Sequence, residues 1–77
     1  MLSDSVFEAI NDILKAVSQY NDYSGEHKKR LILALSHLYM IQWTLDNTKG
    51  NMNSTFTDAQ RYASIEFDRA VNNEFSD

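Results

Sequence analysis

The chain has 77 residues, which is enough for one domain built around one hydrophobic core. It contains no cysteine, so disulfide bonds and thiolate metal sites are excluded and a reducing compartment is favoured. A net charge of −4 disfavours direct nucleic-acid binding, and a hydrophobic content of 43% argues against a disordered chain.

The start of the chain and its most apolar stretch predict a soluble, cytoplasmic protein. Residues 1–5 have neither the basic nor the apolar region of a secretory signal. Residues 27–47 are rich in apolar side chains but fall short of the ~18 uninterrupted apolar residues that a membrane span needs. We therefore expect no association with a membrane.

Residues 5–20 have the pattern of an amphipathic helix. Ser5 and Glu8 have the spacing of a capping box. In this motif the serine hydroxyl accepts a hydrogen bond from the backbone N–H of Glu8, and the Glu8 carboxylate accepts one from the backbone N–H of Ser5. Apolar residues then recur at alternating steps of four and three, opposite a polar face. The apolar face consists of Val6, Ile10, Ile13, Val17 and Tyr20, with Phe7 and Leu14 beside it.

A central helix is predicted over residues 26–47. Ser24 in the preceding turn is the candidate N-cap. Gly50 is the candidate residue that ends the helix in a left-handed conformation. Its apolar arc is about twice the ~100° stripe of an ordinary surface helix, so two neighbouring helices are needed to cover it. We expect Leu38 to lie in the middle of the buried arc. The arc comprises Leu31, Ala34, Leu35, Leu38, Ile41 and Leu45, with Ile32, Tyr39 and Trp43 on its flank.

A third helix is predicted over residues 56–73. Overlapping capping boxes begin at Thr55 and at Thr57, so the first helical residue is uncertain by one or two positions. Its apolar face is rich in small residues, which allow close approach to the central helix. That face consists of Phe56, Ala59, Ala63, Phe67 and Ala70.

Together these elements predict an all-α fold, a small antiparallel three-helix bundle with up-down-up topology. The two connections are short, which makes consecutive helices antiparallel neighbours. All of residues 1–77 are assigned to this single domain.

The residues that commonly carry catalysis are not arranged for it. His27 and His37 are ten positions apart on one helix, which places them on different faces, whereas a helical metal pair is four apart. Ser36 precedes His37, and adjacent helical residues point apart. The only glycines are Gly25 and Gly50, so no phosphate-binding loop is present. We therefore expect no enzyme activity, no cofactor and no metal.

Two charged clusters have both a functional and an ordinary interpretation. Lys28, Lys29 and Arg30 follow His27 and could contact phosphate, or could be a solvated helix start. Asp4, Glu8 and Asp12 repeat at four-residue spacing on the first helix. They form either an acidic strip that mimics nucleic acid and binds a basic groove of a partner, or an ordinary solvated helix face.

Apolar residues on predicted polar faces are the more informative anomaly. Leu33 and Met40 stand among polar residues of the central helix, and Ile65 stands opposite the apolar face of the third. Such residues indicate a contact surface, unless the chain itself covers them. The candidate partner interface comprises Leu33, Met40, Trp43, Tyr62, Ile65 and Arg69.

The small size, the lack of proline and cysteine, the asparagine-rich loops and the mild acidity are together similar to small phage- or mobile-element-encoded inhibitors of host proteins, anti-CRISPR proteins included. This likeness of composition implies a regulator or inhibitor that acts by binding another protein. A nucleic-acid-associated regulator and an acidic mimic are the alternatives. We also expect a homodimer, formed through Leu33 and Met40.

Overall fold

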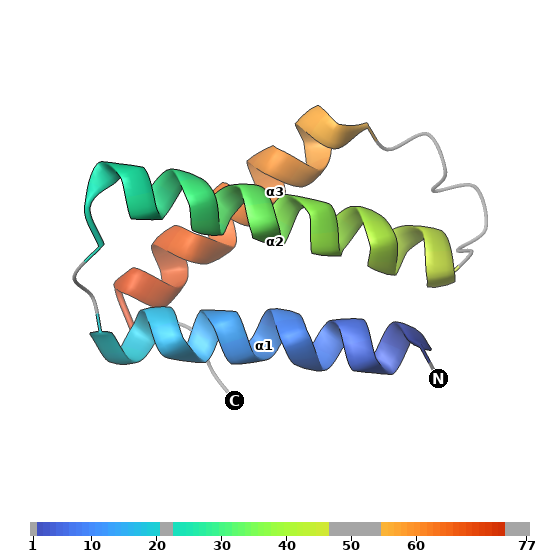
Figure 1. The fold of residues 1–77 in the computed structure, drawn as a ribbon, viewed down its shortest axis with the longest axis horizontal. Coiled ribbons are helices and arrows are strands. Elements are labelled where there is room, and N and C mark those ends of the chain that lie inside the picture. Colours follow the sequence, from blue (N-terminus) through green and yellow to red (C-terminus); the bar gives the residue numbers. More distant parts are fainter. Residues whose placement is uncertain (1, 21–22, 47–54, 74–77) are drawn as a thin grey trace.

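Three helices pack against one another in the computed structural model (Figure 1). The structure describes residues 2–20, 23–46 and 55–73. Helix α1 spans Leu2–Tyr20, α2 spans Gly25–Asp46 and α3 spans Phe56–Val71, and these three ranges contain no strand. The predicted all-α three-helix fold is therefore confirmed.

The start of α1 differs from the prediction. Because the helix begins at Leu2, Ser5 lies inside it and the predicted capping box of Ser5 with Glu8 is wrong. Asp4 lies in the first turn, where a negative charge favours the helix dipole. The predicted C-terminal residue of the central helix, Asn47, and its terminator Gly50 lie outside the described residues.

The other predicted caps are present. The His27 amide donates to the Ser24 hydroxyl at 3.4 Å, at the start of α2. At the start of α3, Thr55 and Asp58 form a reciprocal capping box with both hydrogen bonds at 3.2 Å, so the first of the two overlapping boxes is the one used. After α3, Asn73 has a φ of 62°, a left-handed conformation that asparagine tolerates better than most residues.

The three helices form a hairpin with a third helix across one side of it. In Figure 1, α1 and α2 lie side by side and antiparallel, while α3 runs obliquely behind them toward the C-terminal end of α1. The contacts between α2 and α3 are the most extensive of the three helix pairs. One side of the hairpin is therefore covered by α3, and the opposite side faces the viewer.

The core lies between the hairpin and α3. Aliphatic residues of α1 contribute Ile10, Leu14 and Val17, which are spaced to face inward together. From α3 come mainly small side chains, which bring its backbone close to α2. The buried residues of α2 and α3 are Leu35, Ser36, Tyr39, Ala59, Ala63, Phe67 and Ala70.

The buried side of α2 is not the predicted one. Ala34, Ile41 and Leu45 were expected in the core arc but are exposed, and Leu38 is only half-buried. Conversely, Ser36, which is not part of the predicted apolar arc, is fully buried. The arc is therefore rotated about the helix axis, toward α3.

The physical reason for this rotation is size. Ser36 is small, and its hydroxyl donates to the Ile32 carbonyl oxygen at 2.6 Å, so its burial leaves no polar group unpaired. Ala59 and Ala63 on α3 are also small and fully buried. A close approach of two helices requires such residues at the contact, because larger ones would hold the backbones apart.

One end of the bundle is closed by contacts from the start of α2 to the end of α3. Tyr23 packs edge-on against Phe67 with ring centroids 5.9 Å apart. The Lys28 Nζ atom lies 5.8 Å from the centre of the Phe67 ring and 3.6 Å from an oxygen of Asp68. Lys28 therefore ties α2 to α3, with its charged end still in contact with water.

Candidate functional site

An aromatic cluster joins α2 to the N-terminal half of α3. The Tyr39 and Tyr62 rings meet edge-on at a centroid distance of 4.8 Å, and Trp43 lies 6.4 Å from Tyr39 and 6.3 Å from Tyr62. Tyr39 is buried, Trp43 is half-buried and Tyr62 is 44% exposed. The cluster therefore extends from the core to the surface.

The electrostatics around Tyr39 favour its neutral form. Burial raises the pKa of the Tyr39 hydroxyl well above its usual range, and the nearby Glu66 carboxylate and Tyr62 hydroxyl add to the shift. Glu66 is itself held by Arg69, whose Nη1 atom donates to a Glu66 oxygen at 3.1 Å. The side chain of Glu66 is mostly covered, and that of Arg69 is half exposed.

Three of the predicted interface residues share the outer side of α3. Tyr62, Ile65 and Arg69 are separated by three and four positions, which places them on one helix face, away from the buried alanines. Ile65 is 51% exposed. We call these three residues the α3 surface. Trp43 lies beside it through its contact with Tyr62.

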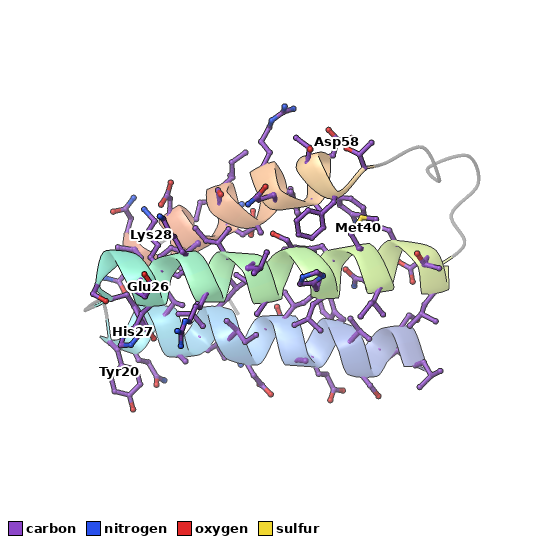
Figure 2. All side chains as sticks on the ribbon, turned by 45° about the horizontal axis from the view of Figure 1, so that its top comes forward. Tyr20, Glu26, His27, Lys28, Met40 and Asp58 are labelled. Carbon is purple, nitrogen blue, oxygen red and sulfur yellow. The ribbon has the colours of Figure 1, made fainter. Side chains whose placement is uncertain are left out.

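The other two predicted interface residues, Leu33 and Met40, lie elsewhere. Leu33 is exposed and lines a hollow of about 350 Å³ between α2 and α3, whose walls include Gln60 and Ser64. Met40 is half-buried against the core, and Figure 2 shows it on the side of α2 nearest α3. Leu33 and Met40 are seven positions apart and share one side of α2, as the predicted homodimer requires, but Met40 is half-buried there and only Leu33 is exposed.

Exposed apolar residues that the sequence analysis placed in the core form another surface. Ile41 and Leu45 are 46% and 38% exposed, and with Met40 and Thr44 they line a hollow of about 220 Å³ on α2. The apolar spacing identified these residues, but periodicity alone does not say which of two apolar stripes on a helix is covered.

The basic cluster is spread over several sides of α2. Lys28 faces α3, and Lys29 lines the hollow beside Leu33. Arg30 pairs with Glu26, its Nε atom lying 3.8 Å from a Glu26 oxygen. Successive residues of a helix point about 100° apart, so these cations form no single patch for a phosphate backbone.

The remaining candidates lie on the surface. Asp4, Glu8 and Asp12 are exposed on α1, and His27 and His37 are exposed on α2. The His37 ring lies 4.9 Å from the Phe56 ring, measured between centroids. In the described part of the chain, no group of three histidine, aspartate or glutamate side chains is placed to hold a metal ion.

In comparisons with known proteins, no family model, no curated protein and no solved structure matches the chain. Within residues 2–20, 23–46 and 55–73, no helix combines the length and apolar character that crossing a membrane requires. What the protein binds has to be inferred from its own surface.

Proposed function

We propose that this protein is a non-enzymatic interaction module, a small regulator or inhibitor that binds another protein through the α3 surface. The observation that carries the proposal is the Tyr62 ring. The ring is substantially exposed, yet the Tyr39 and Trp43 rings pack against it at centroid distances of 4.8 and 6.3 Å. An exposed aromatic ring that is already ordered is a suitable anchor for a protein partner.

Energetic reasons favour this surface as a binding site. Because the Tyr62 ring is packed on one side, it loses less side-chain freedom on binding than a ring free in solvent would lose. Tyrosine and arginine are enriched among residues that dominate binding energies. Ile65 adds an aliphatic side chain, and covering its exposed half contributes about 1 kcal/mol.

Two observations support a role without catalysis. The Ser36 hydroxyl is fully buried and already donates to the Ile32 carbonyl oxygen, so it does not serve as a nucleophile beside His37. His37 itself lies against Phe56, an apolar ring. The dispersal of Lys28, Lys29 and Arg30 likewise favours a protein partner over nucleic acid.

The test compares two variants that each add one negative charge to opposite sides of α3. Ile65→Glu alters the α3 surface, and Gln60→Glu alters the exposed flank beyond the buried alanines. Wild-type protein is immobilised, partners are captured from the host and identified, and each is purified and titrated. We expect Ile65→Glu to weaken binding at least about tenfold, because it replaces an aliphatic side chain in the contact with a charged one, and Gln60→Glu to leave it unchanged.

Other outcomes contradict the proposal. Full binding by Ile65→Glu, with an unchanged helical circular dichroism spectrum, would exclude the α3 surface. A partner lost on raising the salt concentration and displaced by nucleic acid would favour the acidic strip of Asp4, Glu8 and Asp12 instead. Loss of biological activity in His37→Ala, with partner binding intact, would restore an enzymatic interpretation.

A further inference from the structure

Both helices of the hairpin carry an apolar stripe that α3 does not cover. In each stripe the residues recur at alternating steps of three and four, which is the spacing of a helix–helix seam. None of these side chains is fully buried, and four of the largest are exposed. The stripe on α2 is Leu31, Ala34, Leu38, Ile41 and Leu45. The stripe on α1 is Leu2, Val6, Ala9, Ile13, Ala16 and Tyr20.

The stripe on α2 faces away from α3. Ile41 is two positions from both Tyr39 and Trp43, and two helical positions correspond to a turn of about 200°. Tyr39 and Trp43 are close to Tyr62 of α3, so Ile41 points to the opposite side. Leu45 is two positions after Trp43 and therefore also points away from α3. Steps of three and four residues place the other members of the stripe on the same side of α2.

The two stripes lie on the same side of the hairpin. In Figure 2, Tyr20 at the end of α1 and His27 at the start of α2 lie together below α2, whereas Lys28 and Met40 point up toward α3. Tyr20 belongs to the α1 stripe, and His27 is four positions before Leu31 of the α2 stripe. We call the combined surface of the two stripes the hairpin face; it is the side turned to the viewer in Figure 1.

The hairpin face is large enough for a stable contact. Helix α1 has 19 residues, so the face is about 28 Å long, and two helices about 10 Å wide give a footprint of about 560 Å². Two copies together would bury roughly 1,100 Å² or more, which reaches the about 1,000 Å² expected of a specific interface.

The charges at the two edges of the hairpin face are opposite. Asp12 borders the α1 stripe, being three positions after Ala9, and it is exposed. Arg30 borders the α2 stripe, being four positions before Ala34, and its ion pair with Glu26 is largely exposed and therefore weak. A surface with an acidic edge and a basic edge is complementary to itself when it is turned over about an axis parallel to the helices.

We propose that the hairpin face is the dimer interface of this protein, and that a second copy of the chain occupies it. In the dimer, α1 of each copy packs against α2 of the other, and the four helices form an antiparallel bundle with both α3 helices outside. Asp12 lies eight positions before the end of α1, and Arg30 lies five positions after the start of α2. Both are counted from the same end of the hairpin, so each Asp12 comes near Arg30 of the second copy. Packing α1 on α1 instead would bring like charges together, which disfavours it.

This dimer differs from the one expected from the sequence, and it does not depend on the α3 surface. The matched variants are Ile41→Glu, on the hairpin face, and Leu33→Glu, on the other side of α2. These two aliphatic residues have similar exposed fractions, 46% and 43%. Both substitutions are at exposed positions of α2, so neither is expected to unfold the bundle.

The measurement is sedimentation equilibrium of the full chain from low to high micromolar concentration. We expect the wild type to be a dimer, Ile41→Glu to raise its dissociation constant by at least about 100-fold, and Leu33→Glu to change it by less than about threefold. A wild type that stays monomeric at high micromolar concentration overturns the proposal. So does a dimer that Leu33→Glu dissociates and Ile41→Glu does not.

A charge exchange tests the orientation of the two copies. Asp12→Arg and Arg30→Glu should each weaken the dimer, and the double variant should recover most of the loss, because the new charges attract again. If the double variant is weaker than either single one, the packing of α1 on α2 is wrong. Partner binding should survive in Ile41→Glu, and dimerisation should survive in Ile65→Glu, so failure of one proposal is distinguishable from failure of the other.

Discussion

The two sides of α2 differ in what they contain and in what covers them. The side toward α3 carries Leu35, Ser36 and Tyr39, all buried, and so includes two polar groups. The side away from α3 carries Ile41 and Leu45, both exposed, in a stripe that is purely aliphatic from residue 31 onward. In one chain, the more apolar side is therefore the less buried one. Shape at the α2–α3 contact, rather than hydrophobicity alone, determines which side enters the core.

The largest effect should come from shortening a side chain on the covered side. Leu35→Ala should lower the free energy of unfolding by about 2–5 kcal/mol, because it removes a fully buried side chain and leaves a cavity. Ile41→Ala should cost less than about 1 kcal/mol when the protein is dilute enough to be monomeric. Urea unfolding followed by circular dichroism measures both, and equal losses would contradict the assignment of the two sides.

A smaller loss should follow from enlarging a residue at the α2–α3 contact. Ala63→Leu should cost about 1–3 kcal/mol, because the added atoms have no space between the two helices. The matched control is Gln60→Leu, which adds an apolar side chain to an exposed position of the same helix and should stay within about 0.5 kcal/mol. If the bundle accepts Ala63→Leu without loss, the close approach of α2 and α3 is not needed.

The smallest expected effect on the free energy of unfolding at neutral pH comes from changing Tyr39, and this effect increases at alkaline pH. Its pKa is raised in the folded protein, whereas in the unfolded chain it is near 10.0. The unfolded chain therefore loses the proton first, so the stability contributed by the neutral hydroxyl is complete below pH 10.0 and is lost as the pH rises toward the folded pKa.

Tyr39→Phe removes this group and isolates its contribution. The decline of the urea midpoint above about pH 10 should be shallower in Tyr39→Phe than in the wild type. Tyr20→Phe, measured when the protein is dilute enough to be monomeric, is the control, since it removes the hydroxyl of an exposed tyrosine outside the core. Identical declines in all three proteins would mean that burial of Tyr39 does not govern the alkaline response.

The sequence was sufficient for the elements of the fold and for the face of α3. Apolar residues recurring at steps of three and four predicted three helices. The spacing of Ala59, Ala63 and Phe67 predicted the buried face of the third. These predictions depend on local rules, because a cap or an amphipathic stripe is a property of one short segment. The Ser5–Glu8 pair has the spacing of a capping box and so predicts a start at residue 5, but α1 begins at Leu2.

The rotation of α2 could not be predicted by the same rules. Two stripes on this helix have suitable spacing, and choosing between them requires knowing that the small Ser36 will be buried on the side of α2 that packs against α3. The exposure of Tyr62 and Ile65 follows from a local rule, since helical spacing places them away from the alanine face of α3; that they contact a partner stays a prediction. Leu33 and Met40 share the side of α2 nearest α3, where Met40 is half-buried, and the homodimer expected through them stays a prediction.

The alanines of α3 also have a consequence for the route by which the chain folds. While α3 is undocked, α2 has two apolar sides that compete for the interior, and rotating the helix by roughly half a turn exchanges them. Such competition is frustration in the energy landscape, and it slows the search for the native arrangement. Only one rotation buries the small Ser36 on the side of α2 that packs against α3, whose Ala59 and Ala63 are also fully buried. The small residues therefore break a near-degeneracy, and enlarging them should populate the misrotated bundle during refolding as well as destabilise the native one.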